Sequence, residues 1–84
     1  MAAWDAPFRT LTILGGRRDK LRAGDVLGAL TRGVGLAGED VGQIDVGDTR
    51  VYVAIRRAAA GRALRGLAKA RIKKRRFRVL RQGG

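Results

Sequence analysis

The chain has 84 residues and a formal net charge of +12, from 19 lysines and arginines against 7 aspartates and glutamates. It has no cysteine and no histidine, which excludes disulfides, zinc sites built on those residues, and catalysis by a cysteine nucleophile or a histidine base. No apolar run is long enough to span a membrane, so the composition predicts one small basic domain that has a polyanionic partner and needs no metal or cofactor.

The first half of the chain predicts one strand followed by one helix. Residues 1–7 are interpreted as a leader or linker that lacks the basic flank and apolar stretch of a signal peptide, and we expect a cytoplasmic protein. Residues 8–14 are rich in β-branched and large apolar side chains and stop at two glycines, which is typical of a strand. A helix is expected over 21–32, with an apolar stripe formed by Ala23, Val26, Leu27 and Leu30.

Two glycines lie within this predicted helix, and a third follows it directly. Gly24 and Gly28 lie one turn apart, and each costs about 1 kcal/mol relative to alanine. We interpret them as allowing the helix to lie close to a sheet. Gly33 is expected to end the helix, and Leu36 is expected to return to the core.

The second half of the chain predicts three strands and a helix. Strands are expected over 43–46 and 49–55, where apolar and polar residues alternate on either side of a Gly-Asp turn. A helix over 58–69 and a strand over 75–80 follow, and 82–84 are expected to be a disordered tail. The inner stripe of this helix is predicted to consist of Ala60, Leu64, Leu67 and Ala68.

The order β-α-β-β-α-β predicts an α+β, ferredoxin-like or RRM-like domain over 8–81, with four antiparallel strands and two helices on one face. Period two places one set of residues toward the helices: Leu11, Ile13, Ile44, Val46, Val51, Val53, Ile55, Phe77 and Val79. The open face is then expected to carry Thr10, Thr12, Gln43, Asp45, Arg50, Tyr52, Ala54, Arg76 and Arg78. This resembles a degraded RRM platform, because only Tyr52 stands at one of the three usual aromatic positions.

The net charge lies entirely in the second half of the chain. Residues 1–50 hold seven bases and seven acids, whereas 51–84 hold twelve bases and no acid. Such a basic block is often disordered, but Ile72 and Phe77 are interleaved with the bases, which favours a half-buried strand with a basic face. A solvated charged face remains the alternative to a binding surface, as does an ordinary amphipathic strand position for Tyr52.

The turn at 15–20 (GGRRDK) precedes the first helix. Glycine-rich turns at this place expose backbone N–H groups that bind phosphate. The GxxxxGK[ST] motif of nucleotide-binding loops is absent, so no ATP binding is expected. Contact with the backbone or the bases of a nucleic acid is one interpretation of this loop, and a turn without a binding role is the other.

The run 15–30 (GGRRDKLRAGDVLGAL) resembles the start of the RNA-binding domain that follows the helicase core in bacterial DEAD-box RNA helicases of the DbpA and DeaD type. The segments 40–44 (DVGQI), 51–53 (VYV) and 71–73 (RIK) are similar to that family as well, and the resemblance extends over nearly the whole chain. Ala23 departs from it, since many relatives have a proline at the start of the helix.

The resemblance implies an atypical RRM that anchors an ATP-dependent RNA helicase to structured RNA, with large-subunit ribosomal RNA as the DbpA-type target. The phosphate loop and the Asp-Glu-Ala-Asp sequence of a helicase core are absent from these residues. The chain is therefore expected to be a non-catalytic domain of such a helicase or a free-standing relative, with no catalytic residue. The expected RNA-binding residues are Arg17, Arg18, Lys20, Arg22, Arg50, Tyr52, Lys73, Lys74, Arg75, Arg76 and Arg78.

Two other functions are compatible with the same fold, because an RRM-like fold does not prove RNA binding. The basic second helix and the C-terminal segment could instead dock an acidic protein or an anionic membrane surface. An acylphosphatase-like hydrolase would need a positioned arginine and an asparagine, and the sequence contains no asparagine.

Overall fold

The computed structural model describes residues 8–81, so the predicted leader at 1–7 and the predicted tail at 82–84 lie outside the described residues. Its strands are β1 (Phe8–Ile13), β2 (Val41–Val46), β3 (Val51–Arg56) and β4 (Val79–Arg81). Its helices are α1 (Ala23–Gly28), which continues into the π-helical segment η2 (Ala29–Val34), and α2 (Arg57–Lys69). Short 3-10 turns, η1 (Arg17–Asp19) and η3 (Gly38–Asp40), stand before α1 and before β2.

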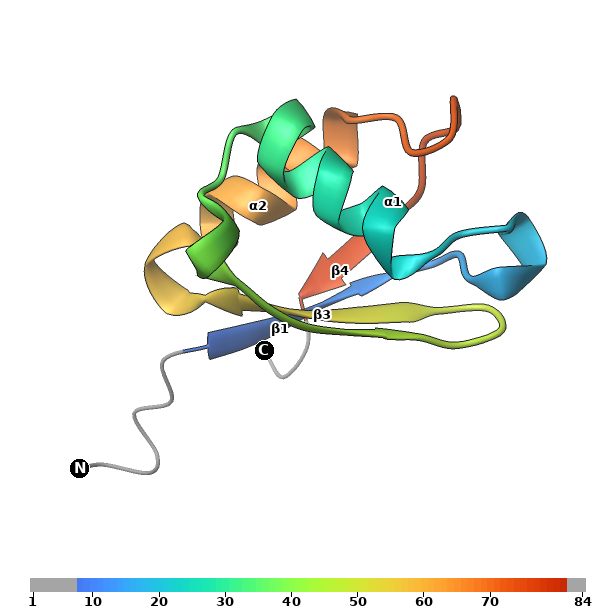
Figure 1. Cartoon of the computed structure of the whole chain (residues 1–84), viewed down its shortest axis with the longest axis horizontal. Coiled ribbons are helices and arrows are strands. Elements are labelled where there is room, and N and C mark those ends of the chain that lie inside the picture. The colour runs from blue at the N-terminus through green and yellow to red at the C-terminus, as the bar shows by residue number, and fades with distance from the viewer. Residues whose placement is uncertain (1–7, 82–84) are drawn as a thin grey trace.

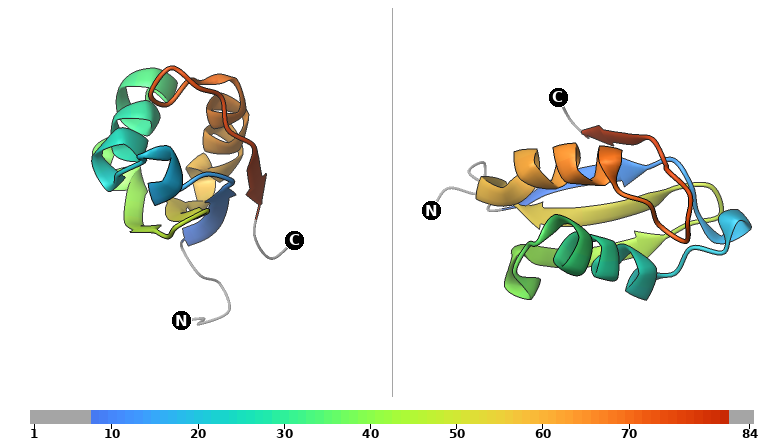
Figure 2. Two further views of the ribbon diagram at one scale, coloured as in Figure 1. Left: turned by 90° about the vertical axis from the view of Figure 1, so that its right-hand side faces the viewer. Right: turned by 90° about the horizontal axis from the view of Figure 1, so that it is seen from above.

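The strands form one antiparallel sheet in the order β2-β3-β1-β4, and both helices cover the same face of it (Figure 1 and Figure 2). This confirms the predicted α+β arrangement. In the central pair, Leu11 of β1 lies opposite Val53 of β3, and Ile13 lies opposite Val51. All of these side chains are fully buried, so the alternation of apolar residues correctly located the core face of the sheet.

The core lies between the sheet and the two helices. Phe77, just before β4, is buried as predicted, and Leu36 returns to the core after η2. Leu21, just before α1, is also buried. The predicted core residues of the two edge strands are half-buried and pack against this cluster: Ile44, Val46 and Val79.

The first helix has different bounds from those predicted. The continuous helix covers 23–34 rather than 21–32. Its end is set by Gly35, whose φ of 92° lies in the left-handed region, and not by Gly33. Glycine adopts that conformation without the steric cost that a side chain would add.

The buried side of this helix is also only partly as predicted. Val26 and Leu30 are buried, but Ala23 and Leu27 are exposed. The winding changes from α to π after Gly28. A stripe with one period of 3.6 residues therefore does not describe both halves of the helix.

The expected role of the helix glycines is wrong. A Cβ at Gly24 would meet no atom within 4 Å, and the three atoms nearest to a Cβ at Gly28 all belong to the flexible side chain of Arg32. The close approach occurs instead on α2, where a Cβ at Gly66 would lie 2.6 Å from both γ-methyl groups of Val34. Gly66 is therefore the position at which the two helices need a residue without a side chain.

The buried face of α2 is rotated from the predicted one. The buried residues are Ala59, Ala60, Ala63 and Leu67. Leu64 is half-buried and Ala68 is exposed. Because alanines occupy both sides of this helix, the sequence does not fix the angle at which α2 faces the sheet.

Alanine substitutions at the two interior glycines of α2 test the helix packing. Helix propensity alone favours alanine at both sites by about 1 kcal/mol. At Gly61 the added Cβ would meet only the Arg65 guanidinium, at 3.4 Å, so we expect Gly61→Ala to stabilise the domain by roughly 0.5–1 kcal/mol. At Gly66 the clash with Val34 should dominate and cost about 1–3 kcal/mol. Urea unfolding measures both changes, and equal stabilisation by the two substitutions would contradict the packing described here.

Candidate nucleic-acid interface

The loop over 15–22 is held in place by its own backbone amides. Each amide from 15 to 22 donates to a carbonyl or carboxylate of the chain. The amide of Arg17 donates to the Gly47 carbonyl at 2.9 Å, and that of Arg18 to the Asp48 carbonyl at 3.0 Å. The hypothesis that backbone N–H groups of this loop bind phosphate is therefore wrong, and the loop can offer a ligand only its side chains.

The paired glycines of the loop serve close packing. A Cβ at Gly15 would collide with the ring of Phe77, and a Cβ at Gly16 would collide with the backbone of Gly47 and Asp48. Gly47 lies in the predicted turn between β2 and β3, where its amide donates to a carbonyl at 2.8 Å. The glycines thus allow the loop to dock against this turn on one side and against the C-terminal segment on the other.

Asp19 joins the loop to the C-terminal segment. One carboxylate oxygen accepts a hydrogen bond from the Gly16 amide at 3.1 Å, and the other accepts one from the Arg75 guanidinium at 2.9 Å. The guanidinium carbon of Arg75 lies 5.0 Å from the centroid of the Phe77 ring. These hydrogen bonds lower the pKa of Asp19, and the bond from the Gly16 amide has a larger effect than the bond from Arg75. Arg75, predicted to contact RNA, therefore already has an internal partner.

The predicted strand over 75–80 is wrong in its first part, because only 79–81 form β4. Ile72 and Arg75 instead exchange backbone hydrogen bonds of 2.7 and 3.1 Å and enclose a two-residue turn. The turn residues Lys73 and Lys74 have φ angles of 53° and 67°. Positive φ at both central residues is the pattern of a type I′ turn, which favours asparagine and glycine.

The loop and this turn together form a basic hollow with a volume of about 400 Å³. The residues that line it, here called the loop hollow, are Arg17, Lys20, Leu21, Arg22 and Lys73. The Nζ atom of Lys73 lies 3.6 Å from Asp25. Within residues 8–81, the side chains of Lys20 and Arg22 have no hydrogen bond or ion pair. The structure thus brings four of the predicted bases together from two distant parts of the sequence.

The lysines of this region are held in a costly conformation. Among residues 8–81, the residues other than glycine with positive φ are Lys20, Lys73 and Lys74. The left-handed region costs a residue with a side chain about 1–2 kcal/mol, and such strain gathers at functional sites. Glycine would relieve the strain and remove the charge. The strained lysines therefore mark this region as a candidate binding site.

The open face of the sheet carries a smaller candidate surface. Tyr52 of β3 is 37% exposed and lies opposite Thr12 of β1, which in turn lies opposite Leu80 of β4. Tyr52 and Leu80 flank Thr12, which is only 6% exposed. Leu80 is 49% exposed and is missing from the predicted open face, although period two counted from Val79 would have placed it there. On β2, Asp45 lies opposite Tyr52.

The other predicted bases are exposed but lie outside the loop hollow. They are Arg18, Arg50, Lys74, Arg76 and Arg78. Arg50 stands in the turn that leads into β3, and the Arg78 carbonyl accepts a hydrogen bond from the Leu14 amide at 2.8 Å. The predicted set is therefore divided: Arg17, Lys20, Arg22 and Lys73 line the loop hollow, Tyr52 lies on the sheet, and these five bases lie in neither the hollow nor a strand.

Neither a metal cluster nor a membrane span is found in the part of the chain that the structure describes. Over 8–81, no three His, Cys, Asp or Glu side chains are grouped so that they could hold a metal ion. No helix of the same segment is long and apolar enough to cross a bilayer.

Comparisons with known proteins agree with the resemblance seen in the sequence. Residues 10–81 match the family model described as the DbpA RNA binding domain. The chain is 47% identical over 79 residues to the ATP-dependent RNA helicase DbpA of Escherichia coli strain K12. That match covers 94% of this chain but only 17% of the helicase. Because the matched region is an RNA-binding domain, the prediction that this chain is a non-catalytic domain is confirmed.

Replacement of Asp19 by asparagine tests the link between the loop and the C-terminal segment. The pKa of Asp19 in the folded protein lies below its ordinary value of 3.8. Its carboxylate therefore contributes stability that is complete above about pH 5 and is lost as the pH falls through the lowered pKa. We expect Asp19→Asn to be less stable than wild type at neutral pH and to lose less stability on acidification, as measured by urea unfolding.

The matched control is Asp45→Asn, on the exposed face of β2. The Asp45 carboxylate accepts a hydrogen bond from Gln43 at 3.0 Å and forms no ion pair within residues 8–81. This variant should follow the wild-type dependence on pH. An Asp19→Asn profile that runs parallel to wild type would contradict the role given to Asp19.

Proposed function

This chain belongs to the DbpA RNA-binding domain family, and we propose that it binds structured RNA with the loop hollow as its principal contact. The observation that carries the proposal is the convergence of Lys20, Arg22 and Lys73 on one hollow, with both lysines held at positive φ. The opposite sign of RNA phosphates supports this choice of partner.

The lining of the hollow suits a sugar-phosphate segment. Leu21 is 1% exposed and supplies an apolar floor, while the cations stand around it. Lys20 and Arg22 are free to contact phosphate oxygens, and Arg22 can do so with two parallel N–H donors. Arg17 already pairs with Asp48 at 3.1 Å in an exposed ion pair, which a phosphate can replace at little cost.

The other predicted bases contribute general attraction in this proposal. Arg18, Lys74, Arg76 and Arg78 are exposed around the hollow and the sheet, and each phosphate that they neutralise releases counterions. Arg75 acts differently, because its bond to Asp19 keeps the turn with Lys73 beside the loop. We place Arg75 in the interface as a positioning residue.

Membership of the family supports a proposal for the biological role. The similar protein from Escherichia coli is named an ATP-dependent RNA helicase, and this chain spans about a sixth of its length. We propose that the domain anchors a helicase core in the same polypeptide to structured RNA in the cytoplasm. Ribosomal RNA of the large subunit is the proposed target, as the sequence resemblance implies.

Lys20→Gly tests the loop hollow without disturbing the fold. The φ of Lys20 is 65°, so glycine should leave stability unchanged or raise it by about 1 kcal/mol. We expect RNA affinity to fall by roughly 3- to 10-fold, and the slope of log affinity against log salt to become less steep by about 0.9, as one phosphate contact is lost. Fluorescence anisotropy with a labelled fragment of large-subunit ribosomal RNA measures both quantities.

The matched control for Lys20→Gly is Arg9→Gln. Arg9 is exposed at the far end of β1, outside the loop hollow, and its replacement lowers the net charge by the same amount. It should weaken binding much less. An equal loss in the two variants would reduce the hollow to general charge attraction, and wild-type binding that does not respond to salt would reject RNA binding through phosphates.

Tyr52→Ala tests the sheet face separately. If a base stacks on the half-exposed ring, the substitution should cost about 1–3 kcal/mol of binding free energy. Tyr52→Phe is the control, since stacking requires the ring and not the hydroxyl group, and it should retain wild-type affinity. Affinity for the same RNA within error of wild type in the alanine variant would show that Tyr52 is an ordinary strand residue.

A further inference from the structure

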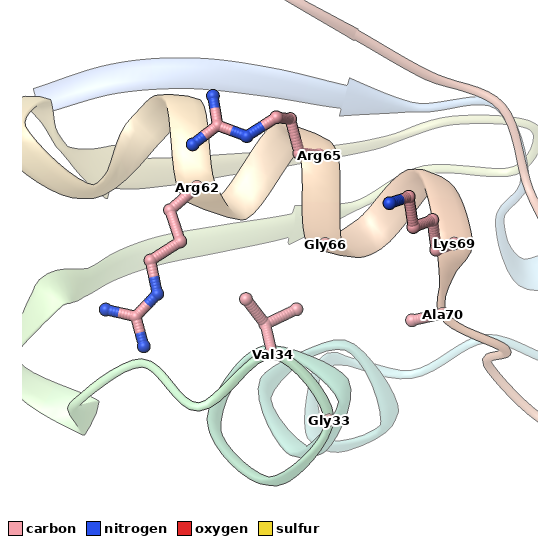
Figure 3. A pocket seen from close by; sticks show the side chains of 7 residues that line it. All are labelled: Gly33, Val34, Arg62, Arg65, Gly66, Lys69 and Ala70. Carbon is pink, nitrogen blue, oxygen red and sulfur yellow. The ribbon is translucent and has the colours of Figure 1, made fainter.

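A second basic hollow lies on the side of the molecule opposite the open sheet face. It is a groove of about 480 Å³ between η2 and α2, here called the helix groove. Figure 3 shows Arg62, Arg65 and Lys69 leaving α2, with Val34 of η2 on the other side. The remaining lining residues have little or no side chain, and they are Gly33, Gly66 and Ala70.

The charge of the helix groove is of one sign and is not neutralised. The groove has no acidic lining residue. Arg62 donates a hydrogen bond to the Gly35 carbonyl at 3.2 Å, which orients its guanidinium but leaves its charge. Within residues 8–81, the side chains of Arg65 and Lys69 have no hydrogen bond or ion pair. Three cations along one helix edge, without an internal counterion, require a polyanion or solvent.

The helix groove is continuous with the loop hollow along the chain. α2 ends at Lys69, and the chain passes through Ala70 and Arg71 into the turn that carries Lys73. Lys69 lines the groove, Lys73 lines the loop hollow, and no acid stands between them. In Figure 1 this connection lies level with the helices, on the side of the sheet away from its open face.

We propose that the helix groove holds the phosphate backbone of the same RNA that enters the loop hollow, so that the RNA passes over the helices. This rests on the proposed function. An RNA backbone fits better than an acidic protein segment, because every nucleotide would present a negatively charged phosphate along the continuous basic path. The open sheet face is less suited to a backbone, since the row around Tyr52 also contains Asp45 and Leu80.

The experiment compares two RNAs that differ only in length. The first is a stem-loop from large-subunit ribosomal RNA, and the second is the same stem-loop with its stem lengthened by one helical turn. The longer RNA should bind the wild-type domain at least tenfold more tightly if its stem reaches the helix groove. The test variant is the double substitution Arg65→Gln, Lys69→Gln. It should remove most of this advantage and leave the affinity for the short stem-loop nearly unchanged.

Two controls separate the groove from general charge. Arg9→Gln with Arg81→Gln removes the same charge from exposed positions on β1 and β4, outside the helix groove, and should preserve the advantage of the longer RNA. Gly33→Glu places an acid in the groove at a position where a Cβ meets no atom within 4 Å. It should abolish the advantage, whereas Gly33→Gln, of equal size and uncharged, should not.

The possible results distinguish a failure of the helix groove proposal from a failure of the proposed RNA-binding function. If wild type binds neither RNA, the RNA-binding function and the helix groove proposal both fall. If wild type binds both RNAs but the groove variants behave like the charge control, the groove proposal alone is overturned. If those variants leave RNA binding intact and lose binding to a polyglutamate peptide, the groove docks an acidic protein and the RNA path over the helices is rejected.

Discussion

The Asp19 carboxylate is the contact on which the candidate site depends. One of its oxygens accepts a hydrogen bond from the Gly16 amide, and the other accepts one from the Arg75 guanidinium. It therefore joins the loop to a residue 56 positions farther along the chain. Without it, the turn that carries Lys73 would keep one longer side-chain ion pair to the first half of the chain, the 3.6 Å pair with Asp25, besides the packing of Phe77 against Gly15 and the Leu14–Arg78 backbone hydrogen bond. The loop hollow is lined by residues from both the loop and the C-terminal turn. Its shape therefore depends on the link between these two segments.

Ion pairs between the two halves of the chain use the uneven distribution of charge along the sequence. The acids of the first half hold particular bases in place, as Asp25 holds Lys73 and Asp40 holds Arg56. Since the second half has no acid, its other bases cannot be paired within it. They repel one another in the compact state, and a bound polyanion would relieve this repulsion. The acids thus position the surface, and the excess bases give it its attraction.

The sequence predicted the sheet well because its signal was strong. Val51, Val53 and Ile55 alternate with polar or small residues, and one register buries them all. The helices were harder, since α2 has alanines on several sides and a π-helical segment alters the phase of the first helix. The lysine turn could not be predicted either, because Lys73 and Lys74 occupy positions that normally favour asparagine and glycine.

The loop was predicted as a candidate site on a physical argument that the structure contradicts. Its glycines suggested exposed amides, yet every amide from 15 to 22 is used internally. Glycine is needed there because Phe77 and the turn at Gly47 approach so closely. Because the loop backbone is already fixed, it loses little conformational entropy when a ligand binds to the side chains of Lys20 and Arg22. The hollow stands where the loop bonds to the β2–β3 turn, which leads to Arg50, and where the C-terminal segment brings Lys73 from the end of α2. A ligand bound there can extend over the sheet or over the helices, and on the helix side it would meet Arg62, Arg65 and Lys69, with no acidic residue in the lining of the groove.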